Sequence, residues 1–445
     1  MNESAQRVPM KRLWTFFLPL GISASLVTIS HVIINGTLAR APDPETIIAS
    51  YAVAMSLLTI TERPAVLLRQ TCSALVRDRT SFSSMLFVGQ AVFVSIMALG
   101  FLVSYTSLGE WIFMGLFGVS ASQYPYVLDV YRVLMFVSVF SGIRCLYQGV
   151  IIFQLRTKWL TIGMVIRLAG MYLLSLYFIR TGVTSGRVGA IIFLAGMMIE
   201  AAISFAEGRR LIRRLPAKDP EHTVESKGQV FSFYRPLLLS AFITVWIGPT
   251  INAWLGKTGD AALAIASFAI AGSLVNLVTS FFSYFHQIVL NFYKIDPGAV
   301  RRFTLTLGFV PALLIAVLAF TPVGEWLLEH AMAVRGELRD ESLSALRAFI
   351  PLALVMPWLD ALNGLVMVRG QTKLIFGSQA ANLGMTVLML VVLIGLNPSW
   401  NGAIGALAQS FGLAAEFAFV GFALRRVHPI DTALRDKRNK VERSI

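Results

Sequence analysis

Four arginines lie within long apolar stretches of this 445-residue sequence, where a charged side chain is costly and usually serves a function. They are Arg63, Arg69, Arg144 and Arg167. A guanidinium group presents a planar fork of N–H donors that matches the oxygen atoms of carboxylates and phosphates. We therefore expect this group, Arg144 and Arg167 above all, to bind small organic or inorganic anions.

Acidic residues in similar stretches leave a second interpretation open. Glu62 and Glu200 could neutralise the arginines as ion pairs, with no ligand involved. Arg69 lies near the end of its stretch, so its side chain could instead extend to the water interface. Arg167 lies close to the middle of its stretch, where such an extension is difficult.

The first apolar stretch carries polar side chains on one helical face. Thr28, His31 and Asn35 follow one another at the spacing i, i+3 and i+7, and Asn252 occupies the place of Asn35 in a later stretch. We expect this face to line a binding cavity, with His31 able to titrate near neutral pH. A buried, hydrogen-bonded histidine is the alternative.

Motifs typical of enzymes and metal sites are missing. Gly256-Lys257-Thr258 resembles the end of a phosphate loop, but Ile251 stands where that motif requires glycine. The sequence has no nucleophile elbow and no HExxH motif, and Cys72 and Cys145 form no CxxC pair. We expect neither an enzyme nor a bound metal or cofactor.

Composition indicates a membrane protein. Hydrophobic residues make up 56% of the chain and charged residues 14%, and the mean hydropathy is +0.70. Twelve stretches are long enough to cross a bilayer as helices, which needs about 20 apolar residues each. These stretches are approximately 14–38, 47–75, 82–105, 127–153, 159–180, 188–206, 231–255, 261–290, 303–321, 343–368, 374–396 and 402–424. The expected fold is an all-α bundle of twelve transmembrane helices.

The net charge of +14 is distributed asymmetrically between the loops. Lysine and arginine concentrate before the first stretch, in alternate loops such as 76–81 and 207–230, and after residue 424. This positive-inside pattern predicts that both termini lie in the cytoplasm. We expect a plasma-membrane location, with the basic tail in contact with lipid headgroups. Because the pattern explains the charge, we do not expect nucleic-acid binding.

The two halves of the sequence are related by duplication. A shift of 217 residues aligns 19–57 with 236–274, with 15 of 39 positions identical. We therefore predict an N-terminal six-helix lobe and a C-terminal one related by a pseudo-twofold axis along the membrane normal. The predicted segments are a first lobe at 1–206, a cytoplasmic linker at 207–230, a second lobe at 231–424 and a basic tail at 425–445. Such parallel repeats are typical of transporters that work by alternating access.

The repeat separates shared residues from those peculiar to one half. Arg132 aligns with Arg347 and Glu200 with Glu416, which predicts packing or helix-clamping roles. The four intramembrane arginines have uncharged or weakly basic counterparts, namely Ser280, His286, Leu359 and Asn382. The first half is thus selectively cationic, as an anion site requires.

Several segments resemble a known family. Leu18-Pro19-Leu20-Gly21-Ile22, Ala49-Ser50-Tyr51, Arg77-Asp78-Arg79-Thr80, Pro64 and Phe233-Tyr234-Arg235-Pro236-Leu237 are similar to the progressive ankylosis protein family. That family lies within the MATE-like multidrug/oligosaccharidyl-lipid/polysaccharide (MOP) flippase superfamily. The resemblance implies two six-helix lobes around a central cavity and export of small polyanions such as pyrophosphate, nucleotide or citrate.

These observations predict a monomeric, bilayer-embedded exporter of a small anionic molecule. The main alternative is cation-coupled multidrug efflux with Glu62 or Asp360 as the coupling group, although the first and seventh stretches contain no Asp or Glu. A lipid-linked flippase is a third interpretation, and we see no further pair of spans after the twelfth. The Gly248-Pro249 pair predicts a break in the seventh stretch, and Pro249 is the candidate gate.

Overall fold

The computed structural model describes residues 7–220, 222–258, 260–332 and 334–426. Within these residues every regular element is a helix, and twelve helical segments are long and apolar enough to cross a membrane. The predicted all-α, twelve-span fold is confirmed. Of the predicted basic tail at 425–445, only Arg425 and Arg426 lie inside the described residues, at the end of the last helix.

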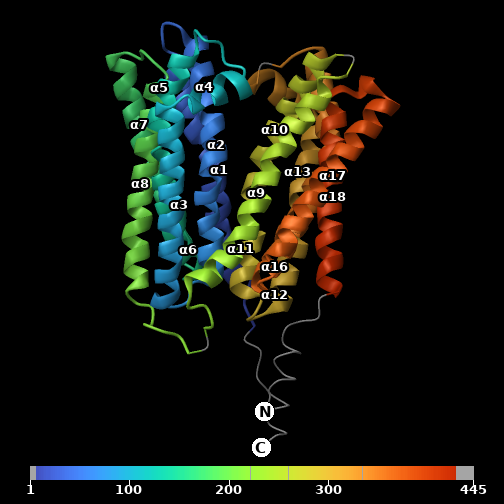
Figure 1. Cartoon of the computed structure of the whole chain (residues 1–445). Coiled ribbons are helices and arrows are strands. Elements are labelled where there is room, and N and C mark those ends of the chain that lie inside the picture. The colour runs from blue at the N-terminus through green and yellow to red at the C-terminus, as the bar shows by residue number, and fades with distance from the viewer. Residues whose placement is uncertain (1–6, 221, 259, 333, 427–445) are drawn as a thin grey trace, which may run out of the picture. The chain divides into compact units, whose positions relative to one another are not determined.

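The chain forms two compact units, shown in blue to green and in yellow to red in Figure 1. We call Trp14–Leu238 the first lobe, and the described residues before Trp14 and from Leu239 onward the second lobe. The changes of unit fall inside helices, near the starts of the first and seventh spans.

The first lobe contains six spans. The buried aromatic and aliphatic side chains of its core include Phe113, Tyr131 and Phe193. Its helices are α1 (Met10–Leu38, from Trp14), α2 (Pro44–Leu75), α3 (Arg79–Tyr105), α4 (Leu108–Glu110), η1 (Trp111–Leu116), α5 (Tyr124–Leu134), α6 (Val137–Phe153), α7 (Lys158–Thr181) and α8 (Arg187–Ile212).

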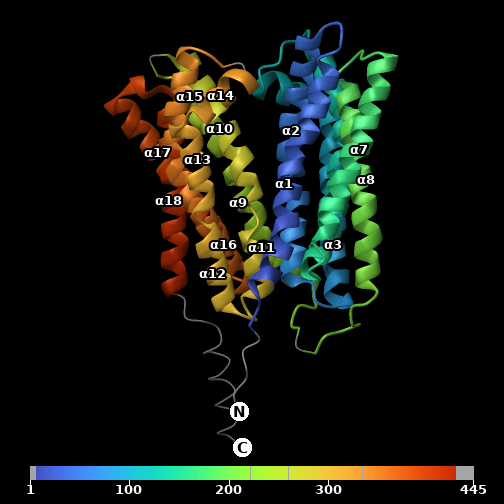
Figure 2. The same ribbon diagram turned by 180° about the vertical axis from the view of Figure 1, so that it is seen from behind.

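The second lobe also contains six spans, but its second and third spans are each divided into two helices, α10 with α11 and α12 with α13. Its helices are α9 (Lys227–Leu255, from Leu239), α10 (Ala261–Phe281), α11 (Phe285–Phe292), α12 (Pro297–Leu307), α13 (Val310–Phe320), α14 (Pro322–Trp326), η2 (Leu327–Ala331), α15 (Glu337–Ala348), α16 (Ile350–Val368), α17 (Lys373–Leu396), η3 (Pro398–Trp400) and α18 (Asn401–Arg426). α17 and α18 lie side by side, as Figure 2 shows from behind, and α7 and α8 form the equivalent pair of the first lobe. Arg167 and Glu200 lie on the first-lobe pair, and Asn382 and Glu416 lie on the second-lobe pair.

Proline affects the spans unequally. The tenth span is divided into α15 and α16 just before Pro351, which occupies the first turn of α16. The predicted break at Gly248-Pro249 is wrong, because α9 continues as one helix through both residues to Leu255. A proline removes a single helical hydrogen bond, and membrane helices tolerate that loss where neighbouring groups satisfy the freed backbone.

Residues common to both halves have matching structural roles. The carboxylate of Asp43 accepts the Thr46 N–H at the start of α2, and that of Asp260 accepts the Leu263 N–H at the start of α10, so both cap helices. The repeated glycines allow close helix packing. A Cβ at Gly149 would lie 2.5 Å from Cys72 Cβ, and one at Gly364 would lie 2.8 Å from the Cα of His286.

The repeated arginines clamp helices, as the repeat predicts. Arg132 donates to the Ser104 carbonyl from Nη2 at 3.3 Å, and its guanidinium lies over the Tyr105 ring. Arg347 donates to the Ala319 carbonyl from Nε at 3.2 Å and lies over the Phe320 ring. Each arginine therefore fastens the end of the preceding span.

The predicted linker packs along the first lobe over much of its length. The carboxylate of Asp78 accepts the Ser81 N–H at 2.7 Å and, through its other oxygen, the Asp219 N–H at 3.0 Å. Burial opposes the charged form of Asp78, but these bonds outweigh it and hold the pKa of this carboxyl below its ordinary value. Thr80 donates to the Ala217 carbonyl at 3.0 Å.

The same segment makes further contacts with the end of α2 and the start of α3. Nε2 of His222 lies 2.7 Å from the Leu75 carbonyl, so this nitrogen carries the proton. The hydroxyl of Ser84 donates to the Glu225 carbonyl at 2.7 Å. The linker is thus fixed to the first lobe at several points.

Candidate functional site

The predicted arginines Arg144 and Arg167 meet inside the first lobe in a buried ion-pair cluster. We define this cluster by residues on four helices: Glu62 from α2, Ser141, Arg144 and Gln148 from α6, Arg167 from α7, and Glu200 and Ser204 from α8. Arg144 and Gln148 are four positions apart, so they lie on one face of α6. The cluster therefore depends on the packing of α6 and α8 against α2 and α7.

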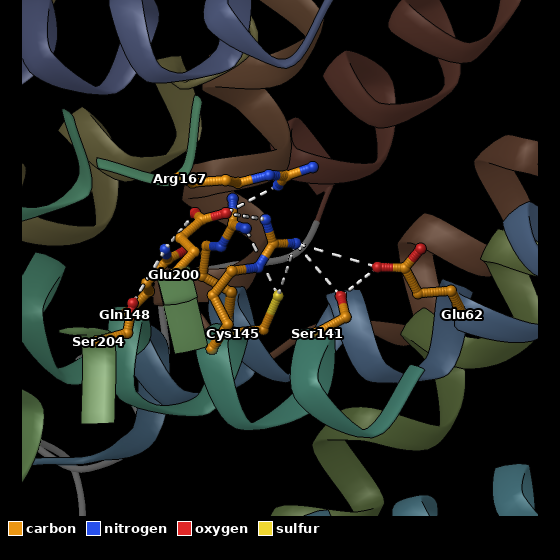
Figure 3. Close-up of polar contacts among 9 residues, drawn as sticks. Glu62, Ser141, Cys145, Gln148, Arg167, Glu200 and Ser204 are labelled. Carbon is orange, nitrogen blue, oxygen red and sulfur yellow. Dashed lines mark hydrogen bonds and ion pairs between the residues drawn. The ribbon is translucent and has the colours of Figure 1, made fainter. Parts of the chain in front are cut away.

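Glu200 is the centre of the cluster (Figure 3). Its Oε2 accepts Nη1 of Arg167 at 2.8 Å and Nη1 of Arg144 at 3.1 Å, while its Oε1 accepts Nε2 of Gln148 at 3.0 Å. The side chains of Glu200 and Arg167 are each 1% exposed. Burial in a low-dielectric interior makes these contacts strong and makes the loss of any one partner costly.

Glu62 is held less tightly on the other side of Arg144. Its Oε1 accepts the hydroxyl of Ser141 and lies 4.0 Å from Nη2 of Arg144, which itself donates to Ser141 Oγ at 3.2 Å. The Glu62 side chain is 16% exposed. Of the two acidic partners, Glu62 is therefore the more exposed and the more distant from the arginines.

Some N–H groups of the two arginines have no acceptor within the cluster. Two guanidinium groups share one fully buried carboxylate, and Nε and Nη2 of Arg167 and Nε of Arg144 have no hydrogen-bond partner among the described residues. The guanidinium of Arg167 also lies 5.2 Å from the centroid of the Phe193 ring. These unpaired N–H groups could bind an additional anionic oxygen.

The remaining predicted residues of the first lobe differ in their surroundings. Arg69 is half-buried and donates to Cys145 Sγ at 3.5 Å, so it borders the cluster. The ring of His31 stacks on Phe193, with centroids 5.8 Å apart, and so reaches Arg167 indirectly. Arg63 and Asn35 are exposed side chains of α2 and α1, and the cluster does not include them.

The second lobe places a different group at the equivalent position. Glu416 of α18 is 1% exposed, like Glu200, but its oxygens accept the side-chain amides of Gln379 at 2.5 Å and Asn382 at 2.7 Å. Both donors belong to α17. A carboxyl group surrounded by neutral donors thus replaces the ion-pair cluster.

The predicted coupling residue Asp360 lies elsewhere in the second lobe. Its Oδ1 is 2.9 Å from Nδ1 of His286, and its Oδ2 accepts the backbone N–H of the same histidine at 2.9 Å. In the repeat, His286 and Asp360 correspond to Arg69 and Cys145. The other predicted residues of this lobe, Asn252 and Pro249, are exposed on α9.

Sequence reasoning missed several members of these groups. Gln148 and Ser204 were not predicted, although each lies four positions from a charged member of the cluster on its own helix. Glu200 was assigned to scaffold and also considered as a partner of the arginines, and the structure shows it bonded to both. Among the residues that the structure describes, no group of three or more His, Cys, Asp or Glu side chains could hold a metal ion.

The fold has clear relatives among solved structures. A MOP superfamily transporter from Pyrococcus furiosus, described as having a binding pocket of reversed polarity that suggests a different function, is 15% identical with a TM-score of 0.74, over 96% of this chain and 98% of that one. A multidrug resistance MATE family transporter in an outward-facing conformation is 14% identical with a TM-score of 0.74, over 95% and 96% of the two chains. The eukaryotic MATE transporter AtDTX14 is 14% identical with a TM-score of 0.71, over 97% and 98%.

These likenesses define the fold class as that of the MATE transporters of the MOP superfamily. The sequence itself matches no protein-family model and no curated protein. The resemblance to the progressive ankylosis protein family therefore remains a prediction.

Proposed function

We propose that the chain is a membrane transporter that exports small anions by alternating access, with Arg144 and Arg167 as the substrate-binding groups. One observation carries the proposal: the two buried guanidinium groups share a single fully buried carboxylate and retain unpaired N–H donors. A buried donor without a partner costs about 1–3 kcal/mol, so an anion that supplies the missing oxygens is favoured.

Substrate binding then takes the form of an exchange. Glu200 stays bonded to both arginines and orients them, whereas Glu62 holds Arg144 only through Ser141 and a distance of 4.0 Å. A carboxylate or phosphate oxygen of the substrate takes the place of Glu62, and the half-buried Glu62 moves toward water. The bound complex keeps its charges paired, as burial requires.

The comparison of the halves supports this assignment. Asn382 and Leu359 stand at the positions equivalent to Arg167 and Arg144, so the duplicated scaffold does not need arginine there. The resemblance to exporters of pyrophosphate, nucleotide or citrate agrees with an anionic substrate. Both termini in the cytoplasm, a plasma-membrane location and a monomeric state complete the proposal.

The test is uptake of radiolabelled pyrophosphate, citrate and ATP by proteoliposomes that contain the purified full-length chain. We expect Arg167→Ala and Arg144→Ala to abolish transport of the substrate that the native protein carries. The matched control is Arg187→Ala, which removes one arginine from an exposed ion pair with Asp129 at the start of α8. Normal transport by both cluster variants would overturn the site.

A second candidate is cation-coupled multidrug efflux. The observation in its favour is that Glu416 and Asp360 are intramembrane carboxyl groups and that, among the described residues, neither forms an ion pair with lysine or arginine. Proton or cation relays in membranes use such groups. A solved MATE transporter of the same fold is a multidrug resistance protein.

Glu62→Gln separates the two candidates. In the anion exporter this change removes the carboxylate that competes with the substrate. The KM for the anion should therefore fall about three- to tenfold, which corresponds to about 1 kcal/mol of binding free energy. In a cation-coupled exporter that uses the carboxyl groups of the second lobe, Glu62→Gln has no such effect on an anion. There, Asp360→Asn or Glu416→Gln stops the efflux of lipophilic cations and abolishes the resistance that expression confers.

A further inference from the structure

The second lobe contains a cavity that the ion-pair cluster does not use. Its volume is about 260 Å³, and it lies between α9, α10, the start of α16 and α18. The residues that decide its chemistry are two glycines, two phenylalanines and two side-chain amides: Gly248, Gly272, Phe268, Phe349, Asn276 and Gln409. All of them belong to the second lobe.

The repeat explains why this space is open. In the first lobe the positions equivalent to Gly248, Gly272 and Gln409 hold His31, Met55 and Phe193. There the rings of His31 and Phe193 stack on each other, and Phe193 and Met55 pack into or against the hydrophobic core. The space that small or polar residues leave open in the second lobe is therefore occupied by large side chains in the first lobe.

The two glycines serve neither backbone strain nor close packing. Neither has a positive φ angle, and a Cβ built at Gly248 or Gly272 would meet no atom within 4 Å. By contrast, a Cβ at Gly402 in α18 would lie 2.3 Å from Ser267 Oγ. Glycine destabilises a helix by about 1 kcal/mol relative to alanine, and at these two positions the missing side chains leave the space of the cavity open.

The lining indicates the class of ligand. Among the described residues that line the cavity, none is charged. Asn276 and Gln409 each offer an amide that can donate and accept hydrogen bonds. The rings of Phe268 and Phe349 have centroids 5.6 Å apart and an interplanar angle of 31°, so they present aromatic surface on which a flat group can pack.

We propose that the second lobe carries its own binding site, for a small uncharged planar molecule that bears hydrogen-bonding groups. This ligand is uncharged, whereas the ligand proposed for the first lobe is an anion. It does not depend on the anion proposal, because its walls come from the second lobe alone. Small-molecule sites commonly combine apolar walls with a few placed polar groups in this way.

The probe for the test is 7-amino-4-methylcoumarin, a neutral, flat and fluorescent molecule with a carbonyl acceptor and an amine donor. Its fluorescence anisotropy is titrated with the purified full-length chain in detergent. We expect saturable binding by the native protein. Gly272→Met fills the cavity with the first-lobe side chain and is expected to weaken binding about tenfold or more, which corresponds to about 1.4 kcal/mol.

The matched control is Gly384→Met. Gly384 lies on α17, is exposed, and also has no atom within 4 Å of a built Cβ, so the same substitution there changes the surface but not the cavity. Gln409→Phe installs the first-lobe residue at the polar end of the cavity and is expected to weaken binding to a similar extent. Melting temperatures of Gly272→Met, Gly384→Met and Gln409→Phe show whether each variant is folded. Gly272→Ala is a smaller substitution at the same position as Gly272→Met.

Arg167→Asn separates this proposal from the anion site. It removes one of the two buried arginines of the first-lobe cluster and is expected to leave coumarin binding unchanged. The proposal is overturned if the native protein shows no saturable binding, or if Gly272→Met and Gln409→Phe bind as tightly as the native chain. It is equally overturned if Gly384→Met weakens binding as much as Gly272→Met.

Discussion

The two lobes place a buried glutamate at the same position of the repeat and surround it differently. Glu200 of the first lobe bonds to two arginines and a glutamine, whereas Glu416 of the second bonds to a glutamine and an asparagine. The helix pairs that carry them, α7 with α8 and α17 with α18, are equivalent. One scaffold thus supports a charged cluster in one copy and a neutral, hydrogen-bonded cluster in the other.

The difference shows what each part of the repeat contributes. The acidic position is common to both lobes and organises the surrounding donors. The identity of those donors, arginine or amide, sets the charge of the lobe interior. Conclusions about function therefore depend on the residues that differ, while the shared residues account for the fold.

The largest expected effect is the removal of the shared acid. Glu200→Gln leaves two buried arginines without their common carboxylate and should destabilise the protein by about 3–5 kcal/mol. Glu416→Gln replaces a carboxyl group that has neutral amide donors and should cost about 1 kcal/mol or less. Thermal unfolding in detergent, followed by circular dichroism, compares the two variants. Equal losses would show that the lobes do not differ in the way described.

Exchange of the donors should change transport beyond what the loss of stability from removing one buried partner explains. Arg167→Asn gives the first lobe the residue of the second and is expected to lower kcat/KM for anion transport about tenfold or more, equivalent to about 1.4 kcal/mol. The reciprocal Asn382→Arg adds a cation beside Glu416 and should leave anion transport unchanged. Initial rates in proteoliposomes test both, and an equal effect of the two changes would contradict the assignment of the anion site to the first lobe.

The repeated clamps should respond alike in both lobes. Arg132→Met and Arg347→Met each remove a hydrogen bond to a backbone carbonyl and a cation–π contact while keeping an unbranched side chain. Each is expected to lower stability by about 1–2 kcal/mol. Melting temperatures of the two variants measured under identical conditions provide the comparison, and a loss confined to one lobe would argue against matched roles.

The smallest effect concerns the linker and is local. Because the folded pKa of Asp78 lies below that of an unfolded aspartate, its contribution is complete above about pH 3.9 and is lost as the pH falls through the folded pKa. We expect pepsin to cleave the linker faster as the pH is lowered in that range. Asp78→Asn should weaken the linker contacts by about 1 kcal/mol at neutral pH. Faster cleavage of the variant by trypsin at pH 7 checks this, with Asp43→Asn, at the cap of α2, as the control.

Much of the fold follows from the sequence because its signals are local or repeated. Apolar length predicts the twelve spans, and the register of the two halves predicts that Arg132 and Arg347 act alike. The break expected at Pro249 is wrong because a helix can continue through a proline at the loss of a single backbone hydrogen bond. The start of α16 at Pro351 shows the opposite outcome for the same residue type.

The candidate site is predictable only in part. Arg144 and Arg167 stand out as charges in apolar stretches, but pairing with Glu200 and binding of a ligand are equally compatible with that pattern. Only the structure shows which guanidinium nitrogens of Arg144 and Arg167 donate to Glu200 and which have no acceptor among the described residues. The cavity of the second lobe is invisible in the sequence, because a glycine in a helix signals empty space only when the surrounding side chains are known.

The two short π-helical turns, η1 at Trp111–Leu116 and η2 at Leu327–Ala331, occupy equivalent places in the two lobes. A π-helical turn is rare in proteins. Its presence in both copies implies that it already existed in the ancestral half before the gene segment was doubled. The difference between Arg167 and Asn382 arose afterwards, so the present structure records the order of events: first a shared architecture, then the divergence of the two copies.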